Sequence, residues 1–172
     1  MSVRPILIAP DPRLKLVSEP VAEVDAQIRT LITDMIETMY DAEGIGLAAV
    51  QVGVAKRILV LDVDQKEGTR APRVFINPVI TWSSEDSEVM EEGCLSVPDI
   101  WDEVERPKAI KAQYLDEHGV PQLLEAEGML AVCLQHEMDH LNGVLFVDHL
   151  SKLKRSMALK KLAKAKKLKK AS

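Results

Sequence analysis

Two histidines in the stretch Gln135–His140 (QHEMDH) stand four residues apart, and Glu137 directly follows the first of them. A residue advances about 100° around an α-helix, so the imidazoles of His136 and His140 leave one face and can reach the same ion. Glu137 points about 100° away from His136, toward a water molecule beside that ion. This H-E-x-x-H arrangement is typical of two metal ligands with a general base, although the bare pattern also occurs by chance.

A metal site needs a third ligand, and the two cysteines are the strongest candidates. Cys133 lies three residues before His136, near the same helix face. Ligands from consecutive turns of one helix point nearly in parallel and close poorly into a tetrahedron. Cys94 lies in a separate segment beside Gly93 and can approach from the opposite side. The sequence favours Cys94 as the third ligand and Cys133 as a buried residue that lines the pocket. The alternative third ligands are the carboxylates, His118 and His149.

A third stretch, Gly44–Gln51 (GIGLAAVQ), is built almost entirely of small or apolar residues. It lacks the glycine and lysine spacing of a phosphate-binding loop. Small residues let another backbone approach closely, as when an extended peptide adds to a strand. Gln51 would then offer a neutral amide donor for an oxyanion. The alternative is a simple turn after the preceding helix.

The composition fits one globular domain in a reducing compartment. The 172 residues are 47% hydrophobic, and only 3% are aromatic, which argues against base stacking as the main activity. No run approaches the roughly 20 apolar residues that span a bilayer. The apolar run between Pro5 and Pro10 is too short for a signal-peptide core. We therefore expect a soluble, cytoplasmic protein in which the two cysteines do not form a disulfide.

The charge is divided unevenly along the chain. Residues 151–172 hold ten of the 22 basic residues and none of the 27 acidic ones, so residues 1–150 carry a net charge of −15. Ala158, Leu162 and Ala165 recur at helical spacing among the lysines of this tail. The pattern predicts a basic, weakly amphipathic helix that is either solvated or bound to RNA phosphates. Its thin apolar face argues against membrane binding.

The apolar patterns predict an α+β fold. A helix is expected over 25–40, with Asp25 as its N-cap, and another over 129–141. Strands are expected over 57–63 and 73–80, where Pro78 marks an edge or a bend, and a hairpin pairs 108–116 with 121–128. The expected order is helix, several strands, helix, strand, helix. This order indicates antiparallel or mixed strands around a central H-E-x-x-H helix, with helices at both ends.

Taken together, three stretches resemble the signature motifs of the bacterial peptide deformylases: GIGLAAVQ at 44–51, EGCLS at 92–96 and QHEMDH at 135–140. They occur in that family's order with similar spacing, and ILIAPDPRL at 6–14 is similar to its N-terminus. The resemblance covers essentially the whole chain. It implies an enzyme that removes the N-formyl group from the initiator methionine of new polypeptides and releases formate.

The resemblance also assigns roles to individual residues. It implies a divalent metal held by three ligands, with water in the fourth position; these ligands are Cys94, His136 and His140. Glu137 would be the general base, and Gln51 with the Leu95 backbone N–H would form the oxyanion hole. The peptide cleft would be lined by Gly44, Ile45 and Gly46. In a looser assignment, the pocket for the methionine side chain would be lined by Met90, Met129, Val132 and Cys133.

The family further implies a cofactor and partners. Fe²⁺ is the expected ion in the cell, and Zn²⁺ or Ni²⁺ can replace it in a purified sample. The substrates would be N-formylmethionyl nascent peptides, reached by docking the basic tail on the ribosome. The expected organisation is a catalytic domain over 1–150 with a helical extension of the same domain over 151–172. Neither membrane binding nor sequence-specific DNA binding is expected.

Two competing functions and two residues stay open at this point. A general zinc peptidase would also use H-E-x-x-H, and an RNA-binding protein could hold a structural metal, although no fourth ligand is evident. Asp139 is expected to anchor the helix, in a pair with Arg106. Trp101 belongs to none of the motifs, so its relation to a bound peptide is undecided.

Overall fold

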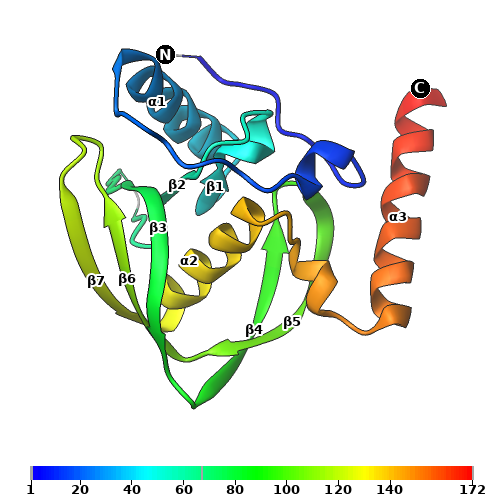
Figure 1. Cartoon of the computed structure of the whole chain (residues 1–172). Coiled ribbons are helices and arrows are strands. Elements are labelled where there is room, and N and C mark those ends of the chain that lie inside the picture. The colour runs from blue at the N-terminus through cyan, green and yellow to red at the C-terminus, as the bar shows by residue number, and fades with distance from the viewer. Residues whose placement is uncertain (1, 67, 172) are drawn as a thin grey trace.

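The computed structural model describes residues 2–66 and 68–171 and places helix α2 (Gly128–Leu141) in the middle of the molecule (Figure 1). The helix lies between a five-stranded sheet and a separate two-stranded ribbon. Ten of its 14 residues are buried, so both its apolar stripe and its histidine face are covered by protein. The expected α+β architecture is confirmed, and the helix that carries His136 and His140 lies at its centre.

The larger sheet is antiparallel throughout and has the order β1-β2-β3-β6-β7. The predicted hairpin is present as β6 and β7, and Asp116 accepts backbone hydrogen bonds within its turn. The sheet's side chains pack against the apolar stripe of α2 in one buried cluster. The strands are β1 (Gly46–Ala48), β2 (Ile58–Leu61), β3 (Arg73–Ser83), β6 (Ala109–Leu115) and β7 (Pro121–Glu127).

Pro78 marks a bend and not an edge strand. It lies in β3, which has neighbours on both sides, at a register shift between Ile76 and Val79. Asn77 adopts a φ of 51° there, and its side-chain amide makes two hydrogen bonds to the backbone of Val21. The bulge removes the need for an N–H that proline lacks.

The two-stranded ribbon consists of β4 (Ser87–Cys94) and β5 (Val97–Pro107), joined by a turn at Leu95–Ser96. Along β5 the buried positions Val104 and Arg106 alternate with the exposed Glu103 and Glu105. The inner face thus lies against the core and the outer face is acidic. The motif analysis did not predict this ribbon as a pair of strands.

Helix α1 (Ala26–Asp41) covers the end of the sheet formed by β1 and β2. As predicted, Asp25 caps it by accepting a hydrogen bond from the Ile28 N–H at 2.9 Å. Its apolar stripe packs into a second buried cluster with the sheet. This packing fixes the chain that leads directly into Gly44–Gln51.

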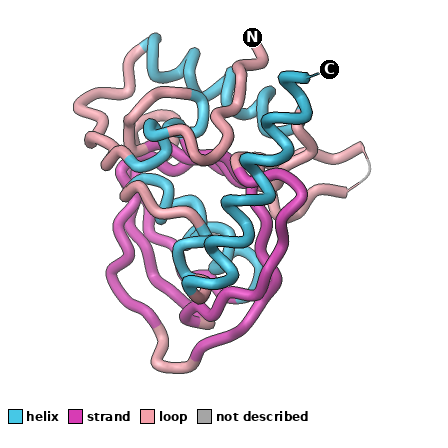
Figure 2. Tube along the Cα trace, turned by 90° about the vertical axis from the view of Figure 1, so that its right-hand side faces the viewer, coloured by secondary structure: helices cyan, strands magenta, loops and turns pink. Residues whose placement is uncertain are grey.

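After α2 the chain forms a short 3₁₀ turn, η3 (Phe146–His149), where a strand was expected. The Asp148 carboxylate accepts a hydrogen bond from the Leu145 N–H and stabilises this turn. The turn leads into helix α3 (Lys152–Ala171), which runs along one face of the molecule (Figure 2). The predicted strand is therefore wrong, because the apolar run is buried as a turn.

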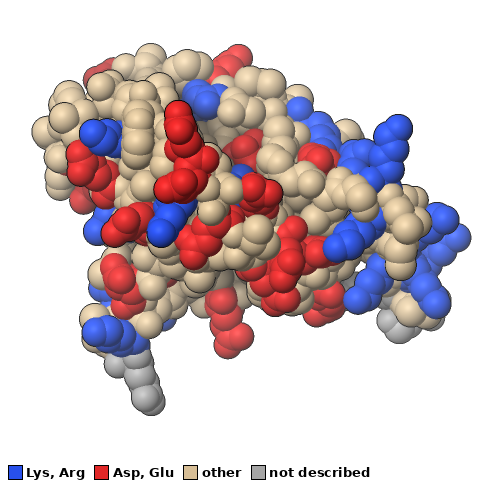
Figure 3. All heavy atoms as spheres, turned by 90° about the horizontal axis from the view of Figure 1, so that it is seen from below, with Lys and Arg blue, Asp and Glu red and all other residues tan. Residues whose placement is uncertain are grey.

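Helix α3 rests on the body through a narrow contact. Ala158 and Leu162 are buried in a third apolar cluster, whereas Ala165 is exposed, so the predicted apolar face ends one turn early. Lys154 pairs with Asp102 at 3.3 Å. Figure 3 shows lysines and arginines gathered at this end of the molecule, next to an acidic face. Within the described residues, no helix is long and apolar enough to cross a membrane.

Candidate metal centre and active site

Helix α2 and the end of β4 together build a site with three potential metal ligands. His136 and His140 project from α2, and Cys94 faces them from the other side, as predicted. One ligand atom from each residue lies within 4.8 Å of the others, and the Cys94 Sγ is 3.3 Å from the His140 Nε2. One thiolate and two imidazoles suit a single divalent transition-metal ion with an open position.

Cys133 is not a member of this ligand group within the described residues. It is buried on α2 in the cluster that faces the sheet. Burial raises the pKa of the Cys133 thiol to about 12, and the nearby charges of Glu137 and Glu92 add to the shift. Burial that disfavours the thiolate this strongly makes Cys133 a poor metal ligand.

The orientation of His136 is fixed by Glu92, whose Oε1 lies 2.9 Å from the His136 Nδ1. Burial raises the pKa of Glu92, but hydrogen bonds from Arg106 and His136 outweigh burial and bring that pKa below its usual value. An ionised carboxylate only accepts hydrogen bonds, so Nδ1 carries the hydrogen and Nε2 keeps its lone pair for a metal.

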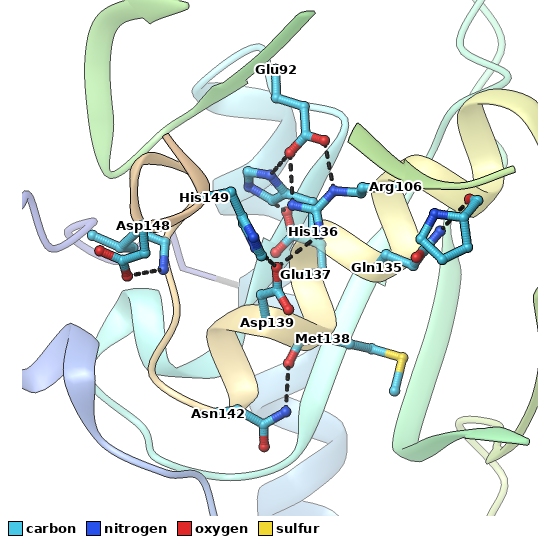
Figure 4. A network of polar contacts seen from close by, with 12 residues as sticks. Glu92, Arg106, Gln135, His136, Glu137, Met138, Asp139, Asn142, Asp148 and His149 are labelled. Atoms are coloured by element: carbon cyan, nitrogen blue, oxygen red, sulfur yellow. Dashed lines mark hydrogen bonds and ion pairs between the residues drawn. The ribbon is translucent and has the colours of Figure 1, made fainter. Parts of the chain in front are cut away.

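Arg106 continues this network away from the site (Figure 4). Its guanidinium donates to both Glu92 oxygens, at 2.6 and 2.9 Å, and to the Asp139 Oδ2 at 2.8 Å. The predicted pair of Asp139 with Arg106 is confirmed. Arg106 and Glu92 are almost fully buried, so each charge depends on the other for its stability in the core.

Glu137 lies beside the ligands and has a free oxygen. Its Oε1 is 3.9 Å from the His136 Nε2, and its Oε2 has no hydrogen-bond partner within the described part of the chain. Burial raises the pKa of Glu137 to about 7. A Cβ added to Gly46 would lie 2.8 Å from the Glu137 Oε1, so glycine makes room for this carboxylate. Such a group can accept and return a proton near neutral pH.

Gln51 directs its amide nitrogen toward the same site. Its Oε1 accepts a hydrogen bond from the Ala48 N–H at 2.9 Å, which fixes the amide orientation. Its Nε2 is 3.0 Å from the Ser96 Oγ and 3.6 Å from the Cys94 Sγ. Leu95 occupies the turn between Cys94 and Ser96, so its backbone lies in the same region.

The other predicted site residues differ in exposure. Gly44 and Gly46 are buried at the start of β1, while Ile45 between them is 44% exposed. A Cβ on Gly44 would meet the Leu95 side chain at 2.7 Å, so this stretch lies against the β4–β5 turn. The four proposed pocket residues are Met129, which is exposed, Met90, which is half-buried, and Val132 and Cys133, which are buried. Their joint pocket stays a prediction.

The contact of Glu92 with His136 was not predicted from the sequence. The sequence contains a signal that could have indicated this contact. Alternate residues of a strand point to the same face, and Glu92 stands two residues before Cys94. The position of the Trp101 ring over Gly93, where an added Cβ would clash with the indole, was not predicted either. That contact explains why glycine precedes the ligand Cys94.

Comparison with known proteins agrees with this geometry. The family model described as Polypeptide deformylase matches residues 3–156. A peptide deformylase of Rhizobium meliloti is 59% identical over 96% of this chain and 95% of its own length. One from Rhizorhabdus wittichii is 58% identical over 100% of both chains.

Solved structures give the same result for the fold. A crystal structure of peptide deformylase from Ehrlichia chaffeensis superposes with a TM-score of 0.91 at 47% identity, covering 96% of this chain and 97% of that one. The one from Legionella pneumophila has a TM-score of 0.91 at 47% identity and covers 99% of both chains. The chain belongs to the polypeptide deformylase family, and it is a metal-dependent hydrolase that removes the N-formyl group from newly made polypeptides.

Proposed function

We propose that the deformylation reaction takes place at the buried site where α2 meets the β4–β5 turn. The observation that carries this assignment is the meeting of three ligand atoms within 4.8 Å beside a buried carboxylate with a pKa of about 7. The ligands Cys94, His136 and His140 come from two elements and approach from different sides. This leaves room for water and substrate on the open side.

Glu137 is the proposed general acid and base. Its free carboxylate oxygen takes a proton from the attacking water and then delivers a proton to the leaving nitrogen of the formamide. Gln51 donates a hydrogen bond from its amide nitrogen to the oxyanion that develops on the formyl carbonyl. The backbone N–H of Leu95 is the second proposed donor, because it lies in the adjacent turn.

The ligand set limits the metal without selecting one. When bound, a divalent cation would lower the pKa of a water molecule and polarise the formyl oxygen. We propose Fe²⁺ as the ion in the cell, with Zn²⁺ or Ni²⁺ as replacements, because thiolate and imidazole ligands accept all three. Cys94 would then be the residue at risk of oxidation.

The substrate is proposed to enter along β1. Gly44, Ile45 and Gly46 would meet the extended backbone of the nascent peptide, because they lie next to both Glu137 and Leu95. The methionine side chain would enter the space bordered by Met90, Met129, Val132 and Cys133. These assignments place the formyl group at the ligands and the rest of the chain outside.

A Glu137→Ala variant tests the assignment of the reaction to this site. Loss of the base should lower turnover of a formyl-Met peptide by at least about 10²-fold while the bound metal is retained. Near-parental turnover would remove Glu137 from the mechanism. The matched variants Cys94→Ser and Cys133→Ser distinguish a metal ligand from a residue that only lines the pocket, since only Cys94→Ser should lose metal. Cleavage of unformylated peptides by the parent protein would favour a general peptidase.

The basic tail is proposed to place this cytoplasmic enzyme at the ribosome. In this proposal residues 1–150 form the catalytic part and residues 151–172 form its extension. The described part of that extension rests on the body through Ala158 and Leu162. The lysines of α3 up to Lys167 are exposed and gathered at one end, which suits contacts to RNA phosphates. Docking through this helix would hold the site near emerging formylated chains.

A further inference from the structure

The network around His136 does not end at Asp139. The Asp139 Oδ2 accepts a second hydrogen bond, from the His149 Nε2 at 2.8 Å, in addition to the one from Arg106. His149 belongs to η3, beyond the end of α2, and its side chain is 39% exposed. One continuous series of contacts thus joins a surface histidine to the metal ligand, as Figure 4 shows.

The same turn touches His136 at a second point. The Phe146 ring stacks on the His136 imidazole, with 6.1 Å between the ring centroids and 27° between their planes. Phe146 is 1% exposed, so it cannot move away without opening the core. Turn η3 therefore reaches this ligand directly through its first residue and indirectly through its last.

We propose that His149 is a positioning residue of the metal site, an inference that rests on the proposed role of His136 as a ligand. It holds Asp139 in place by donating from Nε2, Asp139 holds the Arg106 guanidinium, and Arg106 orients Glu92. Glu92 in turn fixes the His136 ring by accepting from Nδ1. The consequence is tighter retention of the metal.

The geometry favours a positioning role over a surface ion pair. The exposed side chains of His118 and Glu117 are 3.7 Å apart, and within the described part of the chain neither makes a further side-chain hydrogen bond or ion pair. By contrast, the contact of His149 with Asp139 ends on a carboxylate that is shared with a buried arginine. Removing a partner of a ligand typically weakens metal binding 10- to 100-fold, and His149 lies further out.

Zinc release from the zinc-loaded full-length chain to a colorimetric chelator tests the inference. We expect His149→Ala to release zinc about 3- to 10-fold faster than the parent, a smaller effect than that of a direct ligand partner. His149→Gln, which keeps an N–H donor, should recover most of the retention. The matched control His118→Ala should release zinc at the parental rate.

Two further measurements separate positioning from a general effect on stability. In an Asp139→Asn background, His149→Ala should add less than it does in the parent, because the contact that transmits its effect is already weakened. A parental release rate for His149→Ala, an equal effect in both backgrounds, or no recovery by His149→Gln would each overturn the inference. So would a lower Tm of the metal-free protein with unchanged zinc release.

The failure of this inference is distinguishable from failure of the proposed metal site. Cys94→Ser should hold little zinc in the same assay if the site is assigned correctly. If Cys94→Ser loses zinc and His149→Ala does not, the metal site is assigned correctly and the positioning role of His149 is wrong. If Cys94→Ser retains zinc like the parent, both the proposed metal site and the positioning role of His149 are wrong.

Discussion

Helices α2 and α3 both carry polar residues to which we assign a role, but the two helices are held in opposite ways. Helix α2 buries ten of its 14 residues, including His136, Glu137 and His140. In α3, over residues 152–168, Ala158 and Leu162 are the buried positions. The charged side chains around α2 have partners on β4, β5 and η3, whereas those of α3 face mainly solvent.

The difference separates the proposed site of the reaction from the proposed docking surface. A buried charge is costly without a partner, so the groups around α2 must keep one geometry or the fold is destabilised. An exposed lysine costs little in any rotamer, and its charge acts over roughly a Debye length of 8–10 Å. We therefore expect single changes around α2 to have large effects and single changes on α3 to have small ones.

The largest expected effect is the loss of the buried arginine. Arg106→Met leaves Glu92 and Asp139 without their common cation and should lower the free energy of unfolding by about 3–5 kcal/mol. The matched change on α3, Arg155→Met, removes a half-exposed pair with Asp148 and should cost about 1 kcal/mol or less. Urea unfolding of both variants measures the contrast, and equal losses would contradict it.

The next effect concerns the space around Glu137. The Cβ of Gly46→Ala would lie 2.8 Å from the Glu137 Oε1 and 2.9 Å from the Leu61 Cδ2, so the carboxylate must shift. Displacement of a catalytic group by about 1 Å costs roughly 10²-fold in rate. Steady-state kinetics on a formyl-Met peptide should show the loss in kcat, with bound metal unchanged. A kcat within threefold of the parent would show that the site tolerates the methyl group.

A smaller effect is expected where α3 rests on the body. Leu162 is 5% exposed and packs at the edge of the third apolar cluster. Leu162→Ala should lower the free energy of unfolding by about 2 kcal/mol, the low end for a buried leucine, because its surroundings can partly collapse. The neighbouring exposed Leu168, at 65%, gives the control. If both substitutions destabilise equally, α3 does not pack as described.

The smallest effect on the isolated enzyme is expected from the exposed lysines of α3. Replacing Lys160, Lys164 and Lys167 by glutamine should change the free energy of unfolding by about 0.5 kcal/mol or less per site and leave kcat/KM on short peptides unchanged. Ribosome affinity in a pelleting assay should fall, and its dependence on salt should weaken. Unchanged affinity would remove the docking role from α3.

Sequence patterns predicted those parts of the molecule whose signals are local. The stripe and cap of α1, the β6–β7 hairpin and the common face of His136 and His140 depend on spacing alone. The β4–β5 ribbon was missed, since its outer face is acidic and its inner face contains the polar Glu92 and Arg106. Those residues are stable inside only because they meet, which no single strand pattern reveals.

The region after α2 shows a second limit. The apolar run Leu145–Val147 fits a strand as well as a buried turn, because periodicity cannot separate them over so few residues. The choice depends on Asp148, whose carboxylate accepts from the Leu145 N–H and also pairs with Arg155 of α3. Similarly, the residues that cover Ala158 but leave Ala165 exposed belong to the body of the molecule. The tail sequence alone therefore does not reveal where its apolar face ends.

The narrow contact of α3 with the body has a thermodynamic consequence. A tail that folds only on its partner must lose the conformational entropy of its residues during binding, which costs roughly 1–2 kcal/mol per backbone unit. Helix α3 is already formed over Lys152–Ala171, and Ala158, Leu162 and the pair of Lys154 with Asp102 hold its first half. In the proposed docking on the ribosome, the helix would therefore act as a preformed arm about 30 Å long, which would fix the enzyme's orientation at the same time as its position.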